Sequence, residues 1–228
     1  MAPSVQAFID HLTPRHRVIV IGGVAVIGHG FSRHTKDADI WLEPMGSAKV
    51  WATAIEDACR HFEGLTIHSL PEWIEVRGSE IAAAAEEIGM IRIQGLQEPL
   101  NIFRKPNEFT EEIFDAVAER ATHNKDGTLL PTPLDLIESK WDTGREKDQQ
   151  DILFLESLVR SDYKQRLPSA TLAEATSLLA RYCDWQVLQA ALENPLEEVR
   201  ALATQHLQEF ADAGDPFSLA ILEGREIP

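Results

Sequence analysis

Apolar, β-branched runs mark the strands that the sequence predicts in the first half of the chain. Residues 17–22 contain the apolar, β-branched run Val18 to Ile21, typical of a buried strand, and residues 38–42 alternate apolar and polar positions. Residues 90–94 and 100–104 predict two more strands, and the short loop between them indicates a hairpin. Short strands are also expected at 65–68 and 73–77.

Apolar residues at helical spacing separate these strands. They predict helices at 5–13, 24–29, 47–62, 81–87 and 108–122. A further helix, running to about Thr143, has clear start signals: Thr132 suits the N-cap, Pro133 the first helical position and Asp135 the acidic position of a capping box. Another helix should run from Arg145 to about Ser161.

The region after Leu167 carries helical patterns only. The expected fold class is therefore α/β (α+β), with a small mixed sheet flanked by helices in a domain of residues 1–165. Residues 166–228 should form an all-helical C-terminal appendage. The stretch 194–207 vaguely suggests one helical-repeat unit, but solenoids need several stacked repeats.

Composition and charge narrow the classes of function. The 228 residues are 44% hydrophobic and carry a formal net charge of −16. Such acidity argues against non-specific nucleic-acid binding, where Lys and Arg must replace counterions, but it allows a nucleotide in a local basic pocket. No apolar run approaches the roughly 20 residues that span a bilayer, and the N-terminus does not have the pattern of a secretory signal. We expect a cytoplasmic protein without a membrane partner, with Cys59 and Cys183 as reduced thiols.

Two glycines between a predicted strand and a predicted helix are the first sign of chemistry. Gly22 and Gly23 lack side chains, so a phosphate can approach the backbone closely. The helix that follows would present N–H groups and the positive end of its dipole to an anion. The spacing of the glycines in this segment fits neither the Rossmann fingerprint nor the P-loop motif.

Two carboxylates on the next strand are the second sign. Asp37 and Asp39 are two residues apart, so their side chains should face the same side of the strand. Mg²⁺ prefers oxygen ligands of this kind and shares them with substrate phosphates. The loop before them is basic through Arg33, His34 and Lys36.

Two other interpretations of this segment stay open at this point. His29 and His34 could join the two aspartates in a transition-metal site. Alternatively, the segment is a plain glycine-rich turn followed by a solvated Asp-x-Asp pair.

At these residues the chain resembles the DNA polymerase β-like nucleotidyltransferase superfamily, whose signature is Gly-Gly or Gly-Ser after one strand and Asp-x-Asp or Asp-x-Glu on the next. It looks like the small bacterial branch that includes the AbiEii-type toxin nucleotidyltransferases. The matching residues of the first block are Gly22, Gly23, Gly30, Arg33, Thr35, Asp37 and Asp39. Residues 134–151 resemble the second block of that branch, in which a helix supplies a Lys and an Arg and an Asp follow.

The resemblance implies a role for each matching residue of the first block. Gly22 and Gly23 would hold the triphosphate of an NTP, with Arg33 and Thr35 along its phosphate side. The metal ligands, for Mg²⁺ or Mn²⁺, would be the catalytic residues Asp37 and Asp39.

In the second block, the resemblance gives Lys140 and Asp148 catalytic roles. Lys140 would contact phosphate, together with Arg145, and Asp151 occupies a further trailing position. The residues alone leave blander interpretations open, in which Lys140 extends to solvent over Trp141. Asp148 and Asp151 would then simply lie near a helix start, favoured by the helix dipole, or Arg145 would pair with Asp151.

The chain departs from the family pattern on the strand expected at 99–103. Many members carry a third carboxylate there, where it helps to deprotonate the acceptor, but this sequence has Asn101. Asparagine cannot act as a general base. Another acid such as Glu98, Asp148 or Asp151 would have to take the role, or the protein binds nucleotide without transferring it.

The expected function is Mg²⁺-dependent transfer of a nucleoside monophosphate from an NTP to an acceptor hydroxyl of RNA, protein or a small molecule, with release of pyrophosphate. The resemblance suggests a toxin–antitoxin setting, with a cognate antitoxin protein as partner. The alternatives are a catalytically degenerate nucleotide-binding or protein-interaction domain, and an interaction protein that works through its helical tail.

Overall fold

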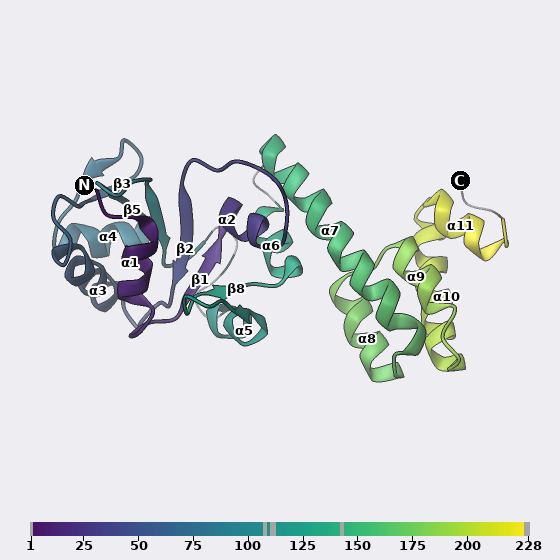
Figure 1. The fold of residues 1–228 in the computed structure, drawn as a ribbon. Helices are drawn as coiled ribbons and strands as arrows, with labels where there is room; N and C mark the ends of the chain where they lie inside the picture. Colours follow the sequence, from purple (N-terminus) through teal and green to yellow (C-terminus); the bar gives the residue numbers. More distant parts are fainter. Residues whose placement is uncertain (1, 107–108, 110–112, 142–143, 226–228) are drawn as a thin grey trace. The chain divides into compact units, whose positions relative to one another are not determined.

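The chain forms two compact units, residues 1–155 and 156–228. The computed structural model describes residues 2–106, 109, 113–141 and 144–225 (Figure 1). The division lies inside helix α7 (Glu146–Arg166), before the boundary at 165 that the sequence predicted. The helix crosses the division because its second half packs with later helices: Val159 is buried, and Arg160 pairs with Asp184.

Within the described part of the first unit, eight strands form one mixed sheet. They are β1 (Val18–Ile21), β2 (Ala38–Leu42), β3 (Thr66–Ser69), β4 (Ile74–Glu75), β5 (Met90–Gln94), β6 (Leu100–Phe103), β7 (Thr122–His123) and β8 (Leu129–Leu130), in the order β4-β3-β5-β6-β2-β1-β8-β7. The pairs β2–β6 and β1–β8 are parallel, and the remaining neighbours are antiparallel.

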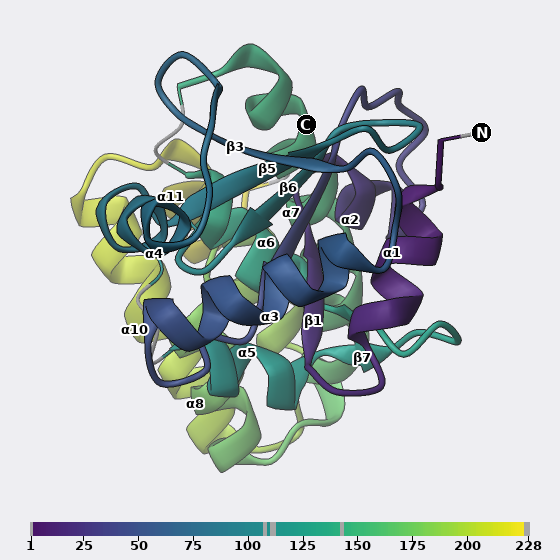
Figure 2. The ribbon, with the colours of Figure 1, turned by 90° about the vertical axis from the view of Figure 1, so that its left-hand side faces the viewer.

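Helices cover both faces of this sheet because successive strand residues point to opposite sides. The helices of this unit are α1 (Val5–Leu12), α2 (Gly22–Gly28), α3 (Ala48–Arg60), α4 (Ser79–Glu87), α5 (Ile113–Arg120) and α6 (Pro133–Lys140). Val18 and Ile40 face the larger core, which α1, α3 and α4 complete on one side (Figure 2). Their neighbours Ile19 and Trp41 face the smaller core with α5 on the other side.

Most elements lie where the sequence predicted them, and β2 and β5 match residue for residue. Strands β7 and β8 were not predicted, because two-residue strands are too short to show an alternating pattern. The helix expected at 108–122 is described from Ile113 and ends at Arg120, while the expected start at Glu108 lies outside the described residues. Helix α6 ends at Lys140, and the predicted end, Thr143, also lies outside them.

The second unit is helical, as expected. After α7 come a 3₁₀ turn (Leu167–Ser169), α8 (Leu172–Arg181), α9 (Trp185–Ala191), α10 (Glu197–Asp212) and α11 (Pro216–Leu222). Asp184 caps α9, and the buried Asn194 donates to the carbonyls of Leu167 and Ala170 at 2.7 and 2.9 Å. None of the helices in the described parts of the chain is long and apolar enough to cross a membrane.

Candidate functional site

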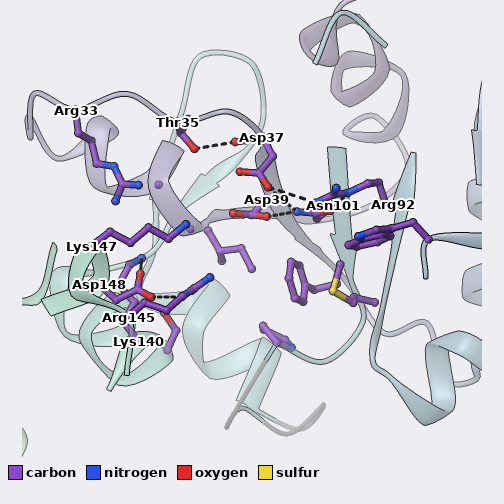
Figure 3. A pocket seen from close by; sticks show the side chains of 18 residues that line it. Arg33, Thr35, Asp37, Asp39, Arg92, Asn101, Lys140, Arg145, Lys147 and Asp148 are labelled. Carbon is purple, nitrogen blue, oxygen red and sulfur yellow. Dashed lines mark hydrogen bonds and ion pairs between the residues drawn. The ribbon is translucent and has the colours of Figure 1, made fainter. Parts of the chain in front are cut away.

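A cavity of about 300 Å³ opens in the first unit where β1, β2, β5 and β6 meet the ends of α2, α6 and α7 (Figure 3). Its described lining residues are Ile21, Gly22, Gly23, Arg33, Thr35, Asp37, Asp39, Trp73, Met90, Arg92, Asn101, Phe103, Pro106, Ser139, Lys140, Arg145, Lys147 and Asp148. All nine residues to which the sequence assigned a role in catalysis, nucleotide binding or metal binding line this one cavity.

The carboxylates of Asp37 and Asp39 converge in the cavity. Asp39 lies on β2 and Asp37 directly precedes it. The Asn101 side-chain amide donates to Asp39 Oδ1 at 2.7 Å and reaches Asp37 Oδ2 at 3.4 Å, so one group lies within reach of both. Burial raises the pKa of Asp39 and the nearby Asp37 adds to this, whereas the Asn101 hydrogen bond and the charges of two lysines oppose the rise.

This donor set suits Mg²⁺ better than a transition metal. The described residues contain no group of three or more His, Cys, Asp or Glu side chains that could hold an ion. His29 instead makes a 2.9 Å hydrogen bond to the Pro131 carbonyl, so the His/Asp metal site considered from the sequence is wrong. Two carboxylates with substrate phosphates and water are the usual ligands of Mg²⁺, which fits Asp37 and Asp39.

Gly22 and Gly23 pack closely against side chains that line the cavity. Helix α2 begins at Gly22 itself, two residues earlier than predicted, because a backbone φ of +63° turns the chain out of β1. A Cβ at Gly22 would lie 2.1 Å from Asp39 Oδ2. A Cβ at Gly23 would lie 3.0 Å from Thr35 Oγ1 and 3.2 Å from Arg33 Nη2. The glycines therefore let the backbone lie close to Asp39, Thr35 and Arg33.

Thr35 and Arg33 reach the cavity from the loop before β2. The Thr35 hydroxyl donates to the backbone carbonyl of Asp37 at 3.0 Å, which fixes the turn into the strand. The Arg33 guanidinium lines the cavity and pairs with the carboxylate of Asp151, whose side chain is 1% exposed. Arg33 is thus held in place by a buried acid of α7.

Lys140 forms the centre of a buried ion cluster. The capping box at Thr132 and Asp135 starts α6 as predicted, and Lys140 lies in the last turn. Its ammonium lies 3.0 Å from Asp148 and 3.0 Å from Asp151, and its side chain is 6% exposed. Arg145 Nε donates to Asp148 Oδ2 at 2.5 Å.

These contacts decide between the interpretations of the second block. Lys140 is buried and does not extend to solvent over Trp141, which is itself 70% exposed. Asp148 lies in the first turn of α7, as the helix-dipole interpretation expected, but Asp148 and Asp151 are also buried and ion-paired with Lys140. The partner of Arg145 is Asp148, not Asp151.

Asn101 occupies the position expected for a third carboxylate. Strand β6 runs parallel to β2, with Asn101 directly opposite Asp39. Of the substitute acids, Glu98 is exposed and does not line the cavity. Asp148 lines it, but this carboxylate is already engaged by Lys140 and Arg145.

Three more side chains able to bind a ligand line the cavity beside the nine predicted residues. Lys147 lines the cavity from the first turn of α7, and Trp73 and Arg92 line it from the β3–β4 turn and β5. Arg92 Nε donates to Asn101 Oδ1 at 2.8 Å, and its guanidinium lies 3.9 Å from the centre of the Trp73 ring. The predicted hairpin carried a signal for Arg92, because this residue pairs directly with Asn101 in the β5–β6 register.

The cavity is basic in an acidic protein. Its described lining includes five basic side chains (Arg33, Arg92, Lys140, Arg145 and Lys147) and three acidic ones (Asp37, Asp39 and Asp148). The lining thus has a formal excess of two positive charges, or of one when the buried Asp151 that pairs with Arg33 and Lys140 is included, against −16 for the whole chain. Low-dielectric walls concentrate such a field, so the cavity favours a compact anion.

The chain matches no protein-family model and no curated protein sequence.

Proposed function

We propose that the protein is a Mg²⁺-dependent nucleotidyltransferase, which transfers a nucleoside monophosphate from an NTP to an acceptor and releases pyrophosphate. The observation that carries the proposal is the composition of the cavity. Two converging carboxylates suitable for Mg²⁺ share one 300 Å³ space with five basic side chains and a glycine turn. A metal–triphosphate complex is the ligand that needs both kinds of group at once.

Different residues of the cavity would bind the metal and the phosphates. Asp37 and Asp39 would hold Mg²⁺, or Mn²⁺, which when bound neutralises charge on the phosphates. Gly22 and Gly23 would let the triphosphate lie close to the first turn of α2, whose N–H groups have no partners within the helix. Lys147 supplies exposed positive charge on the same side.

The buried ion cluster would act mainly by positioning. Lys140 is enclosed between Asp148 and Asp151, so its ammonium contributes field to the cavity while it holds α6 and α7 together. Arg33 and Arg145 are each held by one of these same two aspartates, and both line the cavity. Their guanidinium groups are thus arranged before a ligand arrives, which lowers the cost of ordering them.

The resemblance to AbiEii-type enzymes would place this activity in the cytoplasm, within a toxin–antitoxin pair in which the antitoxin is a separate protein. A second candidate is a nucleotide-binding domain without transfer activity. Asn101 favours it, because an amide cannot accept the proton of a hydroxyl acceptor.

Transfer of label from α-³²P NTPs separates these candidates. The assay would incubate the protein with Mg²⁺, each NTP and fractions of small RNA, protein and small molecules, beside the Asp37→Asn/Asp39→Asn double variant. The proposal predicts labelled product and pyrophosphate that depend on Mg²⁺ and disappear in the double variant. Transfer by the double variant at the wild-type rate would refute the proposal, and NTP binding without transfer would favour the second candidate.

A further inference from the structure

Arg92 holds a positive charge in a fixed place inside the cavity. Its side chain is 19% exposed and is held by the 2.8 Å hydrogen bond to Asn101 and by stacking on Trp73. Its Nη2 lies 3.4 Å from Asp37 Oδ2. The guanidinium is therefore within reach of any group that binds beside the carboxylate pair.

Arg92 lies apart from the other cations of the cavity. In Figure 3, Arg145, Lys140 and Lys147 lie on one side of the aspartate pair, and Arg92 lies on the other side with Asn101. The cavity thus has two cationic ends separated by its metal ligands. If the triphosphate occupies the end with the glycines and lysines, the Arg92 end remains for the acceptor.

The backbone at Trp73 supports a functional role for this end. Trp73 has a φ of +55°, in the left-handed region that a bulky residue rarely adopts. The strained turn is held by a 2.7 Å contact between His68 Nδ1 and the Trp73 carbonyl oxygen. Strain of this kind gathers at ligand-binding sites, where the rest of the fold sustains it. Here it brings the indole against the guanidinium.

Apart from the Asp37 and Asp39 pair, which the proposed metal would occupy, the described residues at this end offer no carboxylate to deprotonate an acceptor. Asn101 stands at the third-carboxylate position, and Asp148 is engaged in the buried ion cluster. A neutral hydroxyl needs a base to become a nucleophile, whereas a phosphate oxygen already carries charge. A guanidinium is also a preferred partner of phosphate, because its planar fork can bind two oxygens.

We propose that the acceptor is a phosphate group and that Arg92 binds it. An oxygen of the phosphate forms a bond to the α-phosphorus of the NTP, the bond from that phosphorus to the bridging oxygen breaks, and pyrophosphate leaves with the electron pair. The product is a phosphoanhydride, and no proton has to be removed from the attacking oxygen. This inference rests on the proposed nucleotidyltransferase function.

Inorganic ³²P-phosphate is the simplest probe, because its nucleotidylation gives a nucleoside diphosphate labelled at the β-position. Hydrolysis of an NTP gives unlabelled diphosphate only, so the label reports the proposed bond. The wild-type protein with Mg²⁺ and each unlabelled NTP should form labelled diphosphate. Radiolabelled glycerol, a neutral hydroxyl probe, should receive no nucleotide in a parallel reaction.

Variants assign the effect to Arg92. Arg92→Gln should lower the yield of labelled diphosphate at least tenfold, and Arg92→Lys, which keeps the charge but loses the fork, should retain more. Arg77→Gln removes the same charge from an exposed position outside the cavity and should match the wild type. Circular dichroism verifies that each variant is folded.

Several results would overturn the inference. Nucleotidylated glycerol without labelled diphosphate would show a hydroxyl acceptor, and undiminished labelled diphosphate from Arg92→Gln would remove the residue from the reaction. Absence of labelled diphosphate from a protein that binds NTP would refute the phosphate acceptor alone. Absence of NTP binding, measured separately, would refute the proposed function and this inference with it.

Discussion

Replacing Lys140 by methionine removes the ammonium that lies 3.0 Å from each of two buried carboxylates. The side chains of Asp148 and Asp151 are 3% and 1% exposed, so water cannot solvate them in its place. Breaking a buried ion pair by removing one partner costs about 3–5 kcal/mol. Since Arg33 and Arg145 still pair with one carboxylate each, we expect the lower end, about 3 kcal/mol.

Thermal unfolding measures this cost directly. In a protein of this size about 1 kcal/mol lowers the midpoint by roughly 2–4 °C, so Lys140→Met should lower it by roughly 6–12 °C. Tryptophan fluorescence suits the assay, because four of the five tryptophans lie in the first unit and two of those, Trp41 and Trp51, are fully buried.

Lys147→Met is the matched control, because Lys147 lines the same cavity but is exposed. It should change stability by less than about 0.5 kcal/mol. Adding Asp148→Asn to Lys140→Met should recover part of the loss, since one unpaired charge is then removed. A Lys140→Met midpoint within 1 °C of the wild type would refute the buried ion cluster as a stabilising element.

Two further outcomes follow from the backbone and the thiols. Gly22→Ala and Gly46→Ala both place a side chain at positive φ, which costs about 1–2 kcal/mol of stability each, but only at Gly22 would the Cβ collide with Asp39. Gly22→Ala should therefore be the less stable variant, and its metal-dependent affinity for NTP should fall at least tenfold. Equal stability and affinity of the two variants would contradict the packing argument. Burial raises the pKa of the buried Cys59 and the half-buried Cys183 to about 12, so both thiols stay protonated at pH 8. A colorimetric thiol reagent should react with the native protein far more slowly than with the urea-unfolded chain, and equally rapid reaction of both thiols in the native protein would contradict the burial of Cys59.

The core strands and the carboxylate pair were predictable because their signals are local. Alternation alone places β2, and the two-residue spacing of Asp37 and Asp39 brings their side chains to one side. The start of α6 was equally readable, since its capping box lies within four consecutive residues. In each case a short stretch of sequence contains the full physical cause.

The remaining features depend on contacts between distant segments. Lys140 is buried because its ammonium pairs with carboxylates on α7. The sequence alone did not decide whether the Lys140 side chain points into the cavity or to solvent. The stacking of Arg92 on Trp73 requires the β3–β4 turn to meet β5, which no periodicity reveals. Strand β8 is fixed by pairing with β1, and β7 by pairing with β8, rather than by their own pattern.

Isothermal titration with the four NTPs tests the central claim most directly. The titration would use non-hydrolysable analogues with and without Mg²⁺, on the wild type and on Asp37→Asn/Asp39→Asn. We predict Mg²⁺-dependent binding of at least one analogue to the wild type and at least a hundredfold weaker binding to the double variant. Absence of binding to the wild type, or equal affinity in the double variant, would contradict the assignment of this cavity to a metal–nucleotide complex.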